Sequence, residues 1–291
     1  MKNSIKTFLK HPTKDNSNRS ANPAVIRAST ILFNTMQELY LHEKKIKKHQ
    51  KISHYSYGRY GSSTTIELEN MLKELEQAFH VFLTGTGFGG VALALMSLCR
   101  PGDEILVSDN VYGPTKEISE KLLKEFKVMA NFYNPDSFED LKNKVSKKTK
   151  MILVENPGSN TFEFQDLSRI VNLAKRKKIY TFLDNTWGTP LYLKPLKLGF
   201  DMSFSSATKY FSGHSDAMGG SLAVNKRVFK QVMFFYKLSG YRMSADEAYL
   251  IIRGLRTLDV RLKQHYENTI KVIKFLKKQK KIKEILYPHN P

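Results

Sequence analysis

The sequence contains one cysteine, Cys99, in 291 residues, so no disulfide can form within the chain. Its position in an apolar run predicts a small core residue and not a reactive thiol. No apolar run approaches the roughly 18–20 residues that a membrane span needs. Met1 to Asp15 carries lysines but no unbroken apolar stretch, which argues against a secretory signal. We therefore expect a soluble, cytoplasmic protein.

Acidic residues are scarce beside basic ones, with 27 Asp and Glu against 47 Lys and Arg, which gives a net charge of +20. Such a charge attracts nucleic acids and anionic lipids. The lysines, however, are scattered through almost every segment, without an aromatic-interleaved basic stripe or zinc-ligand spacing. We expect a lysine-rich solvated surface, no metal site, and neither nucleic acid nor membrane as a partner.

The composition, 41% hydrophobic and 25% charged, is that of a globular protein long enough to bury a large core. Residues 1–55 are polar and irregular and are predicted to form an arm. A helix is predicted next, because Thr64 and Glu67 fit a capping pattern and apolar residues follow at helical spacing.

Short apolar runs and helical segments then alternate to about residue 250. The runs are HVFLTG, EILVSD, MILVEN, YTFLDN, MSFSSAT and GGSLAVN. Strands that are apolar throughout and separated by helices indicate an α/β fold with a mostly parallel sheet covered on both faces. Helical segments dominate beyond residue 250. The predicted domains are therefore an arm (1–55), a large domain (56–250), and a connecting helix with the start of a second domain (251–291).

A glycine-rich turn, GTGFGG at residues 85–90, lies between a predicted strand and a predicted helix and fits the GxGxxG pattern. Glycines let the backbone approach a phosphate, and the helix N-terminus offers N–H groups and a positive dipole end. Three interpretations stay open at this point: a nicotinamide or flavin dinucleotide site, a site for another phosphate, and purely structural glycines.

Asp184 stands at the end of the strand YTFLD, the place where α/β folds bind ligands. A carboxylate there needs a cationic partner, and a protonated pyridine nitrogen is one. The alternative is an aspartate that caps the following turn.

Lys209 follows the apolar strand MSFS in the sequence Ser206-Ala-Thr208-Lys209. Burial at this position would depress the pKa of the amine and favour Schiff-base formation, while the two hydroxyls suit phosphate oxygens. The alternative is a lysine that reaches solvent beside hydroxyls that serve the backbone.

Together, the phosphate turn, the strand-end acid and the Ser-x-Thr-Lys segment supply the contacts that one pyridoxal 5'-phosphate needs. A dinucleotide enzyme does not require the last two. The combination predicts a pyridoxal 5'-phosphate site with a Schiff base on Lys209.

From about Tyr55 to the C-terminus, these motifs resemble the cysteine/methionine-metabolism family of pyridoxal-phosphate enzymes, of the aspartate-aminotransferase-like fold (fold type I). The resemblance implies a seven-stranded, mostly parallel sheet between helices. It also implies a homo-oligomer, a dimer of dimers, in which Tyr57 and Arg59 of YGRYGSST reach the cofactor phosphate of the neighbouring subunit.

The resemblance assigns further roles in the cofactor site. Gly87 and Phe88 match the backbone that binds the phosphate, although the family usually has a small residue or methionine in place of Phe88. Tyr112 matches a tyrosine that stacks on the ring, and Ser159 a residue near the ring hydroxyl. The remaining matches are Asp184 with the ring-nitrogen partner, Ser206 and Thr208 with phosphate ligands, and Lys209 with the Schiff-base lysine.

Within the family, the segments DNTW, GHSDAMGG, RGLRTLDVRLKQH and PGSNT favour cystathionine β-lyase, with Lys209 and Tyr112 as the catalytic residues. The resemblance implies a C-terminal domain with an arginine for the substrate carboxylate, which is expected to be absent after Pro291. The alternatives are a γ-lyase or γ-synthase, and a cofactor-binding remnant without catalysis. His214 is expected to make a structural hydrogen bond.

Overall fold

A seven-stranded sheet forms the centre of the computed structural model, which describes residues 4–10, 21–48 and 55–287. The strand order is β1-β7-β6-β5-β4-β2-β3, and β7 alone runs antiparallel to its neighbours. This confirms the predicted mostly parallel sheet. The strands are β1 (His80–Thr84), β2 (Glu104–Ser108), β3 (Met129–Tyr133), β4 (Thr149–Glu155), β5 (Tyr180–Asp184), β6 (Met202–Ser206) and β7 (Gly220–Val224).

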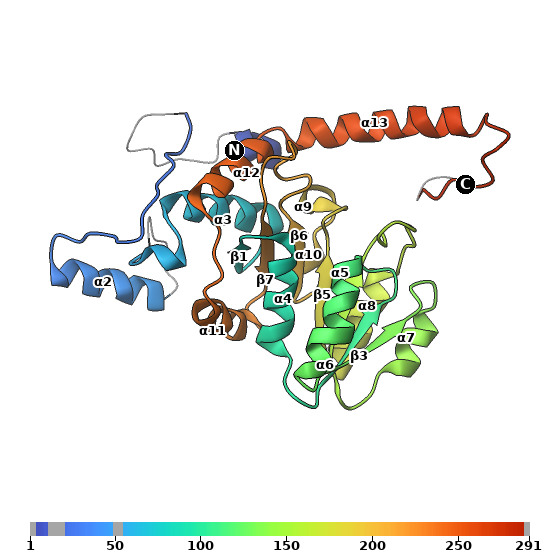
Figure 1. Ribbon diagram of the computed structural model, residues 1–291, viewed down its shortest axis with the longest axis horizontal. Coiled ribbons are helices and arrows are strands. Elements are labelled where there is room, and N and C mark those ends of the chain that lie inside the picture. Colours follow the sequence, from blue (N-terminus) through green and yellow to red (C-terminus); the bar gives the residue numbers. More distant parts are fainter. Residues whose placement is uncertain (1–3, 11–20, 49–54, 288–291) are drawn as a thin grey trace.

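Both faces of the sheet are covered because most strands are apolar on both sides. Phe82 and Leu153 point to the face that packs under α4 (Gly87–Leu98) and α11 (Phe229–Ser239). Leu83 points to the other face, toward α3 (Ser63–Glu76) and α12 (Ala245–Leu255), and Val154 points there toward α8 (Leu167–Lys177). The strands lie between these two layers of helices (Figure 1).

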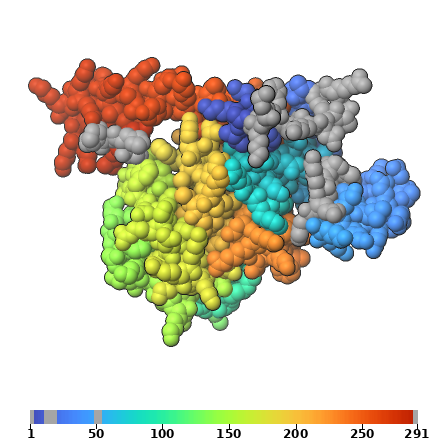
Figure 2. Space-filling view, turned by 180° about the vertical axis from the view of Figure 1, so that it is seen from behind, coloured from blue at the N-terminus to red at the C-terminus, as the bar shows by residue number. Residues whose placement is uncertain are grey.

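The other helical segments connect the strands or lie at the ends of the chain. They are α1 (Ile5–Lys10), α2 (Met36–Lys47), η1 (Gly58–Tyr60), α5 (Gly113–Glu117), a π-helical turn (Ile118–Leu122), α6 (Leu123–Glu125), α7 (Phe138–Lys144), α9 (Thr189–Tyr192), α10 (Pro195–Leu198) and α13 (Leu258–Leu276). α2 and α13 project from opposite sides of the body in both views (Figures 1 and 2).

The prediction that residues 1–55 form an irregular arm is wrong in two places, α1 and α2; residues 1–3, 11–20 and 49–54 lie outside the described residues. Leu9 of α1 is 1% exposed and packs into the core beside α3 and α12, so a short apolar pattern gains its stability from tertiary contacts. The capping prediction is also wrong. Ser62 and Thr65 form the capping box of α3, while Thr64 bonds the backbone of the arm.

The predicted boundary at residue 250 falls inside α12, whose Ile251, Ile252 and Leu255 are buried in the core with α3. α13 follows after a short break and carries exposed apolar residues, among them Val272 and Phe275. The first residues after 250 therefore pack in the core of the large domain, so the predicted boundary does not mark the end of that core. The division into domains stays a prediction.

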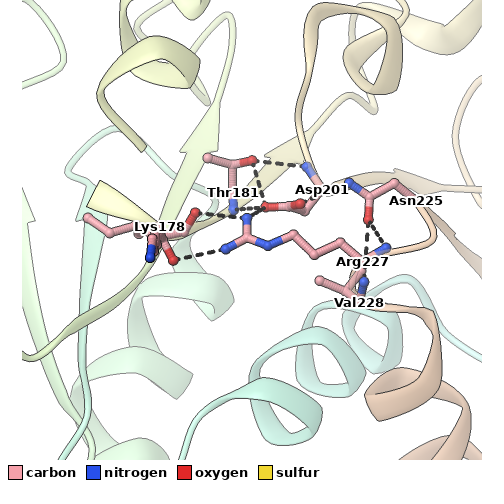
Figure 3. Close-up of polar contacts among 7 residues, drawn as sticks. Lys178, Thr181, Asp201, Asn225, Arg227 and Val228 are labelled. Atoms are coloured by element: carbon pink, nitrogen blue, oxygen red, sulfur yellow. Dashed lines mark hydrogen bonds and ion pairs between the residues drawn. The ribbon is translucent and has the colours of Figure 1, made fainter. Parts of the chain in front are cut away.

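A buried polar network ties three strands together at the amino edge of the parallel strands (Figure 3). Asp201, 4% exposed, accepts hydrogen bonds from Thr181 N at 3.1 Å, Asn225 Nδ2 at 2.8 Å and Arg227 Nη1 at 2.9 Å. Arg227 Nη2 continues to the carbonyl of Lys178 at 2.9 Å. Since Asp201 is charged and nearly inaccessible to water, these partners are what makes its burial tolerable.

Candidate active site

The carboxyl edge of the sheet gathers polar residues and glycines that lie far apart in the sequence. β4 ends at Glu155, β5 at Asp184 and β6 at Ser206, and these strands are parallel neighbours. β7 begins at Gly220, which pairs with both Ser206 and Thr84. In an open α/β sheet this edge is where ligands bind.

The glycine turn and the end of β6 touch each other. A Cβ on Gly87 would lie 2.5 Å from Ser206 Oγ, so only a glycine fits there without a shift. Gly87 and Phe88 are the first residues of α4, and Thr86 caps the helix by accepting from Gly89 N at 3.0 Å. The first N–H groups of a helix have no partner within it. Backbone donors and the Ser206 hydroxyl therefore sit together where a phosphate would be bound.

Asp184 is linked to this pair through Thr186. Asp184 Oδ1 accepts from Thr186 N at 3.0 Å, and Thr186 Oγ1 accepts from Ser206 N at 2.8 Å. Burial raises the pKa of Asp184 to about 6, and the bonds from Thr186 oppose that rise. A buried carboxylate with a raised pKa gains stability from a cationic partner, which is what a protonated pyridine nitrogen supplies.

Lys209 lies in the turn beyond β6, where its backbone N donates to Ser206 O at 3.1 Å. The side chain is exposed, so the expectation of a buried amine is wrong. The physical reason is its position three residues past the end of β6, outside the sheet. Thr208 Oγ1 donates to Gly219 O at 3.3 Å and accepts from Gly219 N at 3.1 Å, so this hydroxyl is engaged by the backbone.

Tyr112 and Ser159 meet at Glu155. Tyr112 N donates to Glu155 Oε2 at 2.7 Å, and the Ser159 side chain lies close enough to this carboxyl group to lower its pKa. Ser159 N donates to Asn110 O at 2.8 Å, which joins the two loops. Tyr112 is 53% exposed and so is accessible from the carboxyl edge.

Tyr57 and Arg59 contact each other, and Arg59 also contacts the end of α11. Arg59 stacks over the rings of Tyr57 and Tyr60 at 5.9 and 4.9 Å, and its Nη1 donates to Lys237 O at 3.3 Å. Tyr57 is 46% exposed. Within one chain Arg59 therefore contacts α11 and Tyr57 contacts Arg59, and their predicted role at a neighbour's site stays a prediction.

The residues at the carboxyl edge fit pyridoxal 5'-phosphate. A Cβ on Gly87 would fill the space beside the Ser206 hydroxyl, and Asp184 is a buried acid that a cation would stabilise. Lys209, which carries an amine, lies in the turn that follows β6. The Cys/Met metabolism PLP-dependent enzyme family model matches residues 6–291. The chain belongs to this family. The predicted family and its cofactor, pyridoxal 5'-phosphate, are thereby confirmed.

Individual members show how close the relationship is. A cystathionine beta-lyase of Haemophilus influenzae is 34% identical over 277 residues, 94% of this chain and 69% of that protein. An L-alanine/L-glutamate racemase of Wolbachia pipientis is 35% identical over 278 residues, 94% of this chain and 68% of that protein. The chain spans about two thirds of the length of the curated relatives it matches, 66% of one of them.

Among solved structures, cystathionine gamma synthase from Xanthomonas oryzae superposes with a TM-score of 0.90 at 27% identity. The match covers 99% of this chain and 72% of that one. This confirms the predicted fold class.

Other expectations concern the surroundings of the site. His214 Nδ1 lies 2.7 Å from Ser212 O, which confirms the structural hydrogen bond. Among the described residues, no three His, Cys, Asp or Glu side chains are grouped to hold a metal. In the same part of the chain, no helix has the length and apolar character to cross a membrane.

Two residues of this PLP-dependent family member were not singled out from its sequence. Glu155 ends a buried strand as Asp184 does, so the same strand-end argument could have found it. Thr186 joins Asp184 to Ser206. The only sequence signal for this role is a hydroxyl side chain two residues after a strand-end acid.

Proposed function

We propose that the chain is a carbon–sulfur lyase that cleaves cystathionine by β-elimination. Cystathionine and water would yield homocysteine, pyruvate and ammonia. The observation that carries the proposal is the meeting of Gly87, Ser206 and Asp184 at one edge of the sheet, with Lys209 in the adjoining turn. The segments DNTW, GHSDAMGG and PGSNT and the beta-lyase relatives support the β-elimination in particular.

Pyridoxal 5'-phosphate, when bound, condenses with an amine and withdraws electrons from the bonds of the attached carbon. Gly87, Phe88 and Ser206 would hold its phosphate, and Thr208 would join them once its hydroxyl turns from Gly219 O to the phosphate. Asp184 would hold the proton on the pyridine nitrogen. Ser159 would lie near the ring hydroxyl, and Tyr112 would stack on the ring.

Lys209 would first carry the cofactor and, once the substrate amine has replaced it, would remove the proton from the substrate Cα. The Cβ–S bond then breaks, and homocysteine leaves with the electron pair on sulfur and takes up a proton. Tyr112 would pass that proton. Hydrolysis of the remaining three-carbon imine gives pyruvate and ammonia, so the atoms balance with one water.

The test is borohydride reduction of the cofactor-loaded chain followed by peptide mapping, combined with product analysis on cystathionine. We expect reduced cofactor on Lys209, and pyruvate in equal amount to homocysteine. Lys209→Ala should lose the visible absorbance of bound cofactor and turnover, while Lys230→Ala, an exposed lysine on α11, should keep both. A Lys209→Ala variant that keeps absorbance and turnover contradicts the proposal.

Product analysis also separates the alternatives. A γ-lyase would release 2-oxobutyrate in place of pyruvate, and a cofactor-binding remnant would be yellow without turnover. Racemisation is a second candidate, because one of the most similar relatives is an L-alanine/L-glutamate racemase. For that function, L-alanine incubated with the loaded chain would yield D-alanine.

A further inference from the structure

Glu155 occupies a position equivalent to that of Asp184 on the neighbouring strand. β4 and β5 are parallel, and Glu155 pairs with Asp184 in the register of the sheet. Paired residues on adjacent strands lie about 5 Å apart, with their side chains on the same face. Two carboxyl groups therefore stand side by side at the edge where the cofactor ring is expected.

Glu155 also fixes the loop that carries Tyr112. Its Oε2 accepts the Tyr112 N–H at 2.7 Å, and the Ser159 side chain lies close enough to the same carboxyl group to lower its pKa. Tyr112 is the N-cap of α5. The bond to its backbone N–H therefore fixes the start of α5 and the position from which the exposed Tyr112 ring projects. One carboxyl group thus contacts the Tyr112 and Ser159 loops and faces Asp184.

We infer that Glu155 is a positioning residue of the cofactor site, which holds Tyr112 by its backbone and, as a neutral acid, leaves Asp184 to carry the single negative charge. This inference rests on the proposed roles of Asp184 and Tyr112. Two ionised carboxylates at paired positions of neighbouring strands repel each other, so the pair favours one proton between them.

Burial, followed by the charge of Asp184, raises the pKa of Glu155 to about 8, against about 6 for Asp184. The bonds from Tyr112 N and Ser159 oppose the rise at Glu155, and Asp184 is the charged group that acts on it. Burial disfavours ionisation of both groups, and we place the one proton on Glu155, on which the charge of Asp184 also acts. The carboxylate charge is left beside the predicted pyridine nitrogen, where it stabilises the protonated ring.

The proton on Glu155 is detectable in the cofactor-free chain. The folded state keeps this proton in a range where the unfolded chain, with an ordinary glutamate pKa, has lost it. Stability from this group is therefore complete at low pH and falls as pH rises toward 8. Urea unfolding between pH 6 and 8 gives the unfolding constant at each pH. In the parent chain the logarithm of this constant should rise with pH, and one proton held by Glu155 contributes to that slope. Glu155→Gln should lower the slope by about one.

Glu125→Gln, an exposed glutamate on α6, is the matched control and should leave the slope unchanged. If Glu155→Gln also leaves it unchanged, Glu155 is not the proton carrier and the inference is overturned.

Positioning of Tyr112 is tested by titrating cofactor-free variants with pyridoxal 5'-phosphate at pH 7 and following protein fluorescence. Glutamine keeps both a neutral group and an acceptor for Tyr112 N, so Glu155→Gln should bind within about threefold of the parent chain. Glu155→Ala loses the acceptor and should bind about five- to tenfold more weakly, the usual effect of one lost hydrogen bond. Equal binding by Ala and the parent, or equal losses in Ala and Gln, overturns the inference.

The two proposals fail separately. If Lys209→Ala keeps borohydride-reducible cofactor, the proposed function fails whatever Glu155 does. If Lys209→Ala behaves as expected while the Glu155 variants match the Glu125→Gln control, only the role of Glu155 is wrong.

Discussion

Gly87 and Ser206, far apart in the sequence, are in such close contact that a Cβ on Gly87 would lie 2.5 Å from Ser206 Oγ. One is the first residue of α4 and the other the last residue of β6. The contact brings helix N–H groups and a hydroxyl to one point, and Ser206 N continues through Thr186 to Asp184. The predicted phosphate and ring-nitrogen groups are therefore parts of one connected structure.

Gly87→Ala should weaken cofactor binding. The added methyl group would collide with Ser206 and displace the hydroxyl or the helix N-terminus that would bind the phosphate. We therefore expect the dissociation constant to rise about tenfold, the effect of about one lost hydrogen bond. Fluorescence titration with pyridoxal 5'-phosphate measures it. Gly113→Ala is the control, since a methyl group there would meet no atom within 4 Å beyond its own chain neighbours and helix backbone. Unchanged binding by Gly87→Ala would mean that the phosphate is held elsewhere.

Asp184→Asn should reduce turnover more than binding. The amide keeps the shape of the carboxyl group but not its charge, and loss of one member of a buried charge pair costs about 2–5 kcal/mol. We expect a fall in kcat of about 30-fold or more, measured as pyruvate released from cystathionine. Asp136→Asn, on an exposed turn before α7, should behave as the parent chain. A full kcat in Asp184→Asn would rule out Asp184 as the ring-nitrogen partner.

Arg59 is expected to act in the neighbouring subunit, which mixing of subunits can test. An Arg59→Ala chain and a Lys209→Ala chain should each be inactive. In a hybrid dimer with shared sites, one site contains both changes and the other is intact, so random mixing should recover about a quarter of the parent activity. Pyruvate release before and after co-refolding measures the recovery. If the mixture stays inactive, Arg59 does not cross to a neighbour's intact site.

Asp201→Ala should destabilise the fold without affecting the cofactor site. Asp201 lies at the amino edge of the sheet, opposite the site, and accepts hydrogen bonds from Thr181, Asn225 and Arg227. Its loss leaves these donors unsatisfied. We expect a loss of about 3–5 kcal/mol in the free energy of unfolding, measured with urea. Asp246→Ala, which breaks the exposed ion pair with Arg27, should change the free energy of unfolding far less, because water and salt screen that pair. Similar losses in the two variants would show that the buried network contributes nothing special.

Most strands and helices could be predicted because their apolar patterns are local. The runs at HVFLT, EILVS, YTFLD and MSFSS became β1, β2, β5 and β6, since continuous apolar residues fit strands buried on both faces. β3 was missed because its residues are mostly only partly buried, so it lacks the continuous apolar run that predicted the other strands. α1 was missed because Leu9 is buried by a distant part of the chain.

The sequence by itself determined the alternation of strands and helices, the glycine turn, the strand-end acids and the lysine after β6, since each depends on residues that are neighbours in the chain. The tertiary structure alone decided that Gly87 touches Ser206, that Glu155 stands beside Asp184, and that Lys209 is exposed. The reason is that strand order and register, set by packing of the whole sheet, decide which strand ends meet at one edge.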